Sequence, residues 1–171
     1  MDVRPEIRAD ERAVDELHRA AFGGEDEPAM VRELRQGDTY LPDLSLVAVQ
    51  GGTVVGHLML TIVALVPDDE TKSEIAVLSL APLGVVPAVQ GQGVGSRLVD
   101  VAMRRASKRI EPFVVVLGHP AYYPRFGFSL ASAQGIRCGL GDVPDEAYLV
   151  RRLPGYRPTG PGVIQYRYPA A

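Results

Sequence analysis

Residues 75–117 predict two strands joined by a loop and a helix, and this unit constrains the fold more than any other stretch. IAVLSLAPLGVV (75–86) and FVVVL (113–117) are apolar runs, and the residues between them carry an apolar stripe at helical spacing. The stripe consists of Val94, Leu98, Val101, Ala102 and Ile110. A strand, a crossover helix and a second strand place the two strands parallel in one sheet. FVVVL is apolar throughout, as expected of a strand covered on both faces.

Two helices are expected at the start of the chain. Apolar residues recur at helical spacing over 9–22, and Gly23 follows as a natural stop. A shorter helix is expected over 28–36, with a proline in its first turn and Gly37 as its terminator. Both helices precede the first strand of the expected order.

From residue 44 onward, the pattern of apolar residues changes from one typical of helices to one typical of β-strands. LSLVAV (44–49), the turn QGG (50–52) and the run 53–66 predict an antiparallel hairpin, with 75–86 as a third strand. Beyond FVVVL the pattern is weaker, and the candidate strands are SAQGIRC, EAYLVRR and GVIQYRY. The order ααβββαβ(α)ββ predicts an α/β fold with one mixed sheet.

Composition limits the domain count, the partners and the compartment. A chain of 171 residues with 46% hydrophobic content fits one domain over residues 1–171. Its 18 basic and 21 acidic residues give no electrostatic footprint for nucleic acid or for an anionic membrane surface. Cys138 is the single cysteine, so no internal disulfide is expected. The charged N-terminus and the lack of a long apolar stretch predict a cytoplasmic protein.

The loop QGQGVG (90–95) predicts a phosphate site or, more simply, a tight turn that glycine permits. The dinucleotide motif GxGxxG fails, because Ser96 stands where its third glycine belongs. A nucleotide triphosphate loop, GxxxxGK[ST], also fails, because counted from Gly91 the residues Ser96 and Arg97 stand where its second glycine and its lysine belong. Backbone N–H groups of a bare loop at the positive end of a helix would still bind an anion.

Six positions before and within this loop resemble the acetyl-CoA motif of the GNAT superfamily, LxVxPxxQ/RxxGxG. They are Leu83, Val85, Pro87, Gln90, Gly93 and Gly95. The resemblance implies a GNAT fold of about six to seven mostly antiparallel strands, with strands four and five parallel and splayed apart. It implies acetyl-CoA as cosubstrate. The residues implied to bind the cofactor are Leu83, Gly84, Val85, Gln90, Gly91, Gln92, Gly93, Val94, Gly95 and Ser96. Pro87, which lacks an N–H, is expected to end the strand and turn the chain away from its parallel neighbour.

A second motif, YPRFGF (123–128), resembles the YxxxGF signature that follows strand five in this superfamily. The stretch 44–170 is similar to the YhbS-like group of predicted N-acetyltransferases. Tyr123 takes the place of the tyrosine that serves as general acid, with Tyr122 a weaker candidate. A phenol can donate a proton to the departing thiolate. Phe126 and Phe128 are expected in the core, and Arg125 would meet either a cofactor phosphate or solvent.

The general base stays open. Glu74 is expected on the surface, Ser79 could orient a water, and His57 in an apolar strand is expected to be a core histidine that stays eligible as a base. His18, on a helix among charged residues, and His119, in a loop, have no acidic or cysteine partners at metal-ligand spacing, so no metal site is expected.

Two functions follow from the resemblance. One is an acetyl-CoA-dependent N-acetyltransferase that acts by direct attack of a primary amine in a ternary complex. The acceptor would be a small-molecule or protein amine, and a homodimer stays open because the superfamily often dimerises. The alternative is a non-catalytic acyl-CoA-binding sensor or partner-binding module, which the missing carboxylate base favours.

Overall fold

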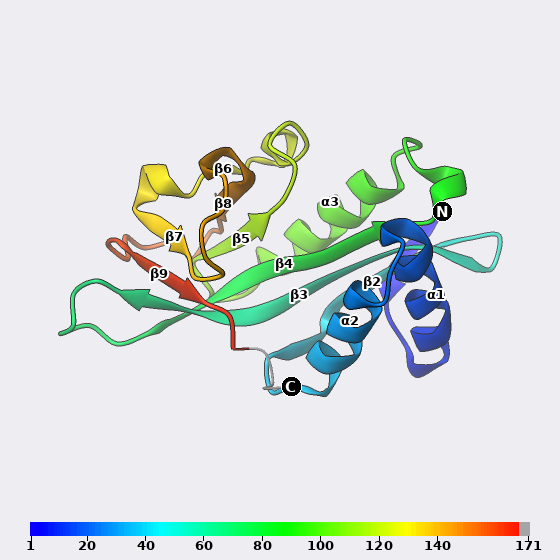
Figure 1. Ribbon diagram of the computed structural model, residues 1–171, viewed down its shortest axis with the longest axis horizontal. Helices are drawn as coiled ribbons and strands as arrows, with labels where there is room; N and C mark the ends of the chain where they lie inside the picture. The colour runs from blue at the N-terminus through cyan, green and yellow to red at the C-terminus, as the bar shows by residue number, and fades with distance from the viewer. Residues whose placement is uncertain (168–171) are drawn as a thin grey trace. The chain divides into compact units, whose positions relative to one another are not determined.

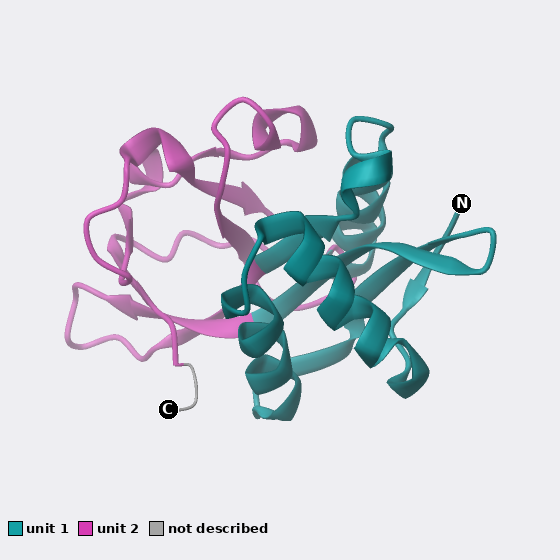
Figure 2. Ribbon diagram, turned by 45° about the vertical axis from the view of Figure 1, so that its right-hand side comes forward, with its two compact units in different colours: residues 1–61, 81–106, 169–171 teal, residues 62–80, 107–168 magenta. Residues whose placement is uncertain are grey.

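The structure, a computed structural model, describes residues 1–167 and divides into two compact units (Figure 2). Residues 1–61 and 81–106 form unit 1, and residues 62–80 and 107–167 form unit 2. Neither unit is one continuous stretch, because β3 (Thr53–Pro67) and β4 (Ile75–Val85) run through both. The last residue of the expected strand GVIQYRY, Tyr168, lies outside the described residues.

Unit 1 contains an antiparallel sheet that begins with a strand absent from the expected order. β1 (Asp2–Pro5) pairs with the far end of β2 (Tyr40–Gln50), from Asp2 opposite Val49 to Pro5 opposite Leu46. β2 pairs with β3 across the turn at 51–52, which confirms the predicted hairpin. β4 is the other neighbour of β3. The expected order was therefore wrong in starting with a helix.

Three α-helices cover the two faces of this sheet (Figure 1). α1 (Glu11–Phe22) and α2 (Asp26–Gln36) pack together on one face, and α3 (Val94–Ala106) lies on the other. The expected stripe of α3 extends too far, because the helix ends at Ala106 and Ile110 is 92% exposed.

Two strand glycines allow the helices to approach the sheet closely. A Cβ on Gly56 of β3 would lie 2.8 Å from Cγ1 of Val94 and 2.9 Å from Cδ1 of Leu98, both on α3. A Cβ on Gly84 of β4 would lie 2.7 Å from Nδ1 of His18 on α1. Neither position has room for a side chain.

Unit 2 carries the parallel pair predicted from the crossover. β5 (Phe113–Leu117) pairs in parallel with β4 over Leu78–Leu80 only, opposite residues 114–116. This ladder ends before Pro82, a proline within β4 that has no N–H to donate to a neighbouring strand. Pro87, to which the sequence assigned the turn away from the neighbour, instead begins the 3₁₀ turn Pro87–Val89 after the strand has ended at Val85.

The remaining strands of unit 2 are short. β8 (Tyr148–Arg152) lies antiparallel between β5 and β6 (Ser129–Leu130), while β9 (Gly162–Gln165) pairs antiparallel with β3 and parallel with β7 (Ile136–Cys138). Nine strands are present among the described residues, more than the six to seven expected. Further 3₁₀ turns cover Arg8–Asp10, Tyr123–Phe126, Ser132–Gln134 and Asp145–Ala147.

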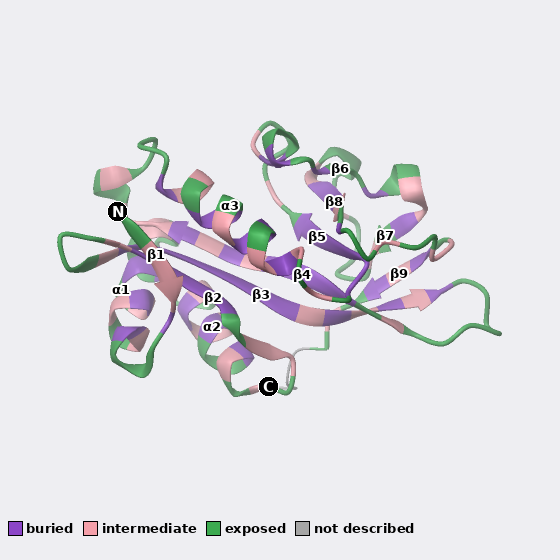
Figure 3. Ribbon diagram, turned by 180° about the vertical axis from the view of Figure 1, so that it is seen from behind, coloured by how far each residue is buried: buried purple, intermediate pink, exposed green. Residues whose placement is uncertain are grey.

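Buried residues concentrate on the strands and recur along the helices (Figure 3). In unit 2 one apolar cluster joins strands from both ends of the sequence: Val63, Leu65, Val77, Phe113, Val115, Ala131, Ile136, Tyr148, Val150 and Ile164. Within residues 1–167, no helix has the length and apolar character needed to cross a membrane.

We expect Gly56→Ala to lower the free energy of unfolding by about 1–3 kcal/mol, because the new methyl group would overlap the buried Val94 and Leu98 side chains. Urea denaturation measures this. Gly24→Ala is the matched control, since a Cβ there meets nothing within 4 Å, and its effect should stay within about 0.5 kcal/mol. Equal stability of the two variants would contradict the close packing of α3.

Candidate active site

The glycine loop between β4 and α3 leaves backbone N–H groups uncovered by side chains. Gly91 and Gly93 adopt left-handed φ values of 74° and 84°, and a Cβ on either would meet no atom within 4 Å. α3 begins at Val94, so Gly95 and Ser96 lie in its first turn. N–H groups of a first turn have no partner within the helix and lie at its positive end. The loop can therefore bind an anion.

The strand before the loop is tied to it by a side chain. Nε2 of Gln90 donates a hydrogen bond to the carbonyl oxygen of Val85 at 3.0 Å, and Nε2 of Gln92 donates to Ala88 at 3.3 Å. The backbone N–H of Val86 donates to Val55 of β3 at 3.0 Å. These bonds fix the end of β4 and the start of the loop. The ten residues that the sequence predicts to bind the cofactor all lie in this segment, residues 83–96 of unit 1.

Tyr123 lies in unit 2, in the 3₁₀ turn that follows β5. Its side chain is buried, and its ring occupies the space that a side chain on Gly118 would fill. Burial, and then the neighbouring Tyr122, raise the pKa of the Tyr123 phenol above its ordinary value. The phenol therefore keeps its proton at neutral pH, as a general acid must.

Aromatic rings around Tyr123 hold its orientation. The rings of Tyr122 and Phe128 lie edge-on to it, with centroids at 5.1 and 5.6 Å. Phe126 and Phe128 are buried, as the sequence predicts. The guanidinium of Arg125 lies 4.8 Å above the centroid of the Tyr122 ring, an arrangement that stabilises both groups.

The candidates for the general base separate clearly. Glu74 is on the surface, where both its oxygens accept from Nη2 of Arg167 at 2.5 and 2.6 Å. Ser79 is buried in β4. His57 is fully buried, as expected, but so is His18, which the sequence placed among charges. The missed signal is spacing, because His18 follows the buried Val14 by four residues on one helix face.

The two histidines belong to a buried network in unit 1. Nε2 of His18 and Nδ1 of His57 are 2.8 Å apart, and Nε2 of His57 lies 3.1 Å from Oγ of Ser45. Ser45 donates to Oε2 of Glu6 at 2.7 Å, and Arg35 donates to Oε1 of Glu6 at 2.5 Å. The chain of bonds runs from α1 through β3 and β2 to the segment after β1.

The network shifts the pKa values of its members. Burial alone would raise the pKa of Glu6, but the hydrogen bond and charge of His57, with bonds from Ser45 and Arg35, outweigh burial and lower it to about 2. Burial, and then the charge of His57, lower the pKa of His18 to about 3. Glu6 is therefore ionised and the His18 ring is uncharged at neutral pH.

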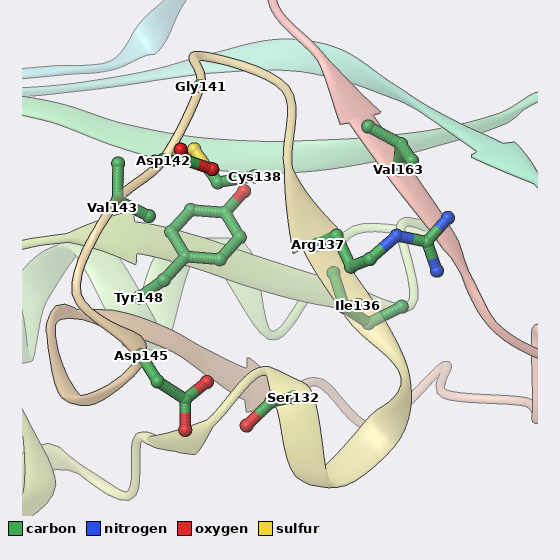
Figure 4. A pocket seen from close by; sticks show the side chains of 10 residues that line it. All are labelled: Ser132, Ile136, Arg137, Cys138, Gly141, Asp142, Val143, Asp145, Tyr148 and Val163. Atoms are coloured by element: carbon green, nitrogen blue, oxygen red, sulfur yellow. The ribbon is translucent and has the colours of Figure 1, made fainter.

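A hollow of about 310 Å³ lies elsewhere in unit 2 (Figure 4). The Tyr148 hydroxyl is 2.8 Å from the Tyr166 hydroxyl. The pKa of Tyr148 is raised, mainly because the residue is buried and secondly because of Tyr166. Arg137 at the rim pairs with Asp68. The lining residues are Ser132, Ile136, Arg137, Cys138, Gly141, Asp142, Val143, Asp145, Tyr148 and Val163. In the described part of the chain, no three His, Cys, Asp or Glu side chains gather as a metal site.

Comparison with known proteins identifies similar chains. A family model described as an acetyltransferase (GNAT) domain matches residues 2–131. YhbS of Escherichia coli K12, an uncharacterized N-acetyltransferase, is 34% identical over 168 residues, which cover 97% of this chain and 96% of that protein. YjhQ of the same strain, also an uncharacterized N-acetyltransferase, is 36% identical over 121 residues, 71% of this chain and 65% of that protein.

Solved structures agree with this match. The crystal structure of E. coli YhbS in complex with CoA superposes with a TM-score of 0.84 at 31% identity, covering 97% of this chain and 89% of that one. A GNAT-family acetyltransferase from Brucella melitensis in complex with acetyl-CoA gives 0.77 at 24% identity, covering 97% and 95%. The second likeness shows the fold alone.

We expect acidification to destabilise the protein between about pH 6.5 and pH 2. The pKa of Glu6 falls from 4.5 to about 2 on folding, and that of His18 falls from 6.5 to about 3. In this window Glu6 and His18 bind protons in the unfolded chain but not in the folded chain, so the free energy of unfolding decreases as the pH is lowered. Urea denaturation at a series of pH values measures the slope.

His18→Gln should flatten this slope between about pH 6.5 and pH 3, because the proton uptake of His18 on unfolding is lost. His119→Gln, at an exposed position outside the network, is the matched control and should leave the slope unchanged. The same slope in His18→Gln and the wild type would contradict a buried, neutral His18.

Proposed function

Because the chain belongs to the GNAT acetyltransferase family, we propose that it transfers an acetyl group from acetyl-CoA to a primary amine, by direct attack in a ternary complex. The observation that carries this proposal is the match to YhbS, which binds CoA in its crystal structure and is 31% identical to 97% of this chain. The bare loop at the start of α3 supports it, because a CoA pyrophosphate is the kind of anion such a loop binds.

The proposed cofactor site is the end of β4 with the loop. The backbone of Leu83, Gly84 and Val85 would bond the pantetheine arm as an added strand, while the loop N–H groups would bind the pyrophosphate. The residues that form the loop part of the site are Gln90, Gly91, Gln92, Gly93, Val94, Gly95 and Ser96.

Tyr123 is the proposed general acid. When the amine attacks the thioester carbonyl, the C–S bond breaks and negative charge develops on sulfur. A buried phenol with a raised pKa is still protonated when the C–S bond breaks, and it donates its proton to the departing thiolate. The N–H near Val85 would polarise the carbonyl oxygen in the tetrahedral intermediate. The acceptor would be a small molecule or a protein amine; the cytoplasm as location and a homodimer as assembly belong to the same proposal.

Acetyl-CoA at 100 times its dissociation constant should stabilise the wild type by about 2.7 kcal/mol, which raises Tm by roughly 5–10 °C for a chain of this size. In Gly93→Ala the shift should shrink, since the methyl group intrudes on the anion site. Gly52→Ala is the control: its φ of 80° matches the 84° of Gly93, and both positions are open. Differential scanning fluorimetry measures all three. A Tm shift in Gly93→Ala as large as in the wild type would contradict the proposal that the loop binds the pyrophosphate.

Tyr123→Phe should lower kcat by about 10²-fold or more, because proton transfer by a positioned acid contributes that much, while acetyl-CoA affinity stays unchanged. A panel of amines with CoA thiol release as readout finds the acceptor and supplies the assay. Tyr122→Phe, next in the chain, is the matched control and should keep most of the activity. A wild type that binds acetyl-CoA yet releases no thiol with any amine would instead support the acyl-CoA-binding module.

A further inference from the structure

The glycine that follows β5 has no side chain where the ring of Tyr123 lies. A Cβ on Gly118 would lie 3.0 Å from Cδ2 and 3.3 Å from Cζ of Tyr123, and closer still to Cε2. Carbon atoms in favourable contact are about 3.5–4.0 Å apart. The φ of Gly118 lies outside the left-handed region, so the backbone conformation does not require glycine. What requires glycine at this position is the space that the tyrosine ring fills.

The contact with Gly118 falls at the hydroxyl end of the Tyr123 ring. Cε2 is bonded to Cζ, the carbon that carries the phenol oxygen, and both atoms lie closer to Gly118 than a methyl group would allow. A methyl group on residue 118 would push this end of the ring and not its Cβ end. The position of the phenol oxygen therefore depends on the absence of a side chain at residue 118.

Hydrogen bonds hold the backbone on both sides of Tyr123 against β8. The N–H of Gly118 donates to the carbonyl oxygen of Ala147, the residue before β8, at 2.9 Å. At the end of the 3₁₀ turn, Nη1 of Arg151 on β8 donates to the carbonyl oxygen of Phe126 at 2.8 Å. A shift of the backbone that made room for a side chain at residue 118 would strain these bonds. The overlap would therefore be relieved by the ring of Tyr123.

The rings packed around Tyr123 restrict where its own ring can move. Those of Tyr122 and Phe128 lie edge-on to it, with centroids at 5.1 and 5.6 Å. Tyr123 and Phe128 are both buried, and buried side chains are packed about as densely as organic crystals. Gly118 completes this enclosure on the remaining contact, so the ring has one well-packed orientation.

We propose that Gly118 is a positioning residue for acetyl transfer, because its missing side chain fixes where the Tyr123 hydroxyl delivers its proton. This inference rests on the proposed function, since it takes Tyr123 as the general acid. Gly118 acts through the tyrosine and not on the reacting atoms. A proton donor must lie within hydrogen-bond reach of the departing sulfur, and a misplacement of about 1 Å costs about 10²-fold in rate.

NMR of the wild-type chain tests the contact itself. We expect nuclear Overhauser effects between the Hα protons of Gly118 and the ε protons of Tyr123, because a Cβ that meets Cε2 would replace one of these Hα protons. The chain has seven tyrosines, and Tyr123→Phe identifies the signals of this one. Absence of these effects in the wild type would overturn the proposal.

Gly118→Ala tests the positioning role. We expect kcat for the amine found by thiol release to fall roughly 10-fold to 100-fold, while acetyl-CoA raises Tm as much as in the wild type. Gly24→Ala is the matched control and should keep the wild-type kcat, since its φ is also outside the left-handed region and a Cβ there meets nothing within 4 Å. Loss of the Tm shift in Gly118→Ala would overturn the proposal, because positioning leaves cofactor affinity intact.

The double variant Gly118→Ala with Tyr123→Phe separates positioning from a general disturbance of the structure. The phenyl ring of Tyr123→Phe overlaps the new methyl group in the same way, but it has no proton to deliver. If Gly118 acts through the phenol, Gly118→Ala should therefore add no further loss of kcat to Tyr123→Phe. An equal loss factor in both backgrounds would overturn the inference.

The single variants distinguish failure of this inference from failure of the proposed function. Wild-type kcat in Gly118→Ala, with kcat lowered in Tyr123→Phe, would overturn the positioning role of Gly118 alone. Wild-type kcat in Tyr123→Phe would overturn the proposed general acid, and the role of Gly118 with it.

Discussion

The buried chain of hydrogen bonds from Glu6 to His18 organises unit 1. Glu6 follows β1, Ser45 lies on β2, His57 on β3, His18 on α1, and Arg35 reaches in from α2. Removing charged and polar groups from water costs several kcal/mol for each ion, and hydrogen bonds to well-placed partners offset that cost. Five elements must therefore be in place together before the cost is offset. Apolar packing alone would tolerate small shifts of α1 that this network does not.

The elements with long, regular patterns could be predicted from the sequence. The hairpin over 44–66, the helix at 94 and the strand at 113 each carry a period that local chemistry imposes. The parallel relation of β4 and β5 followed from their connection, because a crossover helix allows no other sense. The aromatic core around Tyr123 followed from its motif. Such features depend on neighbours in sequence or on short connections.

The rest depended on pairings between distant residues. β1 has four residues and no apolar alternation, and it is a strand because β2 offers it an edge. His18 and His57 are 39 residues apart, so neither position alone reveals their bond. The end of α3 was misjudged at Ile110, because a helical period can continue by chance beyond the residues that pack. The surface pair of Glu74 and Arg167 spans 93 residues.

The adjacent residues Gly56 and His57 tie the register of β3 to both faces of its sheet. Successive side chains on a strand point to opposite sides, so Gly56 makes room for α3 while His57 meets α1. A slip of one residue would put an imidazole against Val94 and Leu98 and leave Glu6 and Ser45 facing a glycine. The slipped register would therefore be unfavourable on both faces: on the α3 face because of steric overlap, and on the α1 face because buried polar groups would lose their hydrogen-bond partners. Gly56 and His57 thus together specify the register of β3 during folding, independently of any ligand.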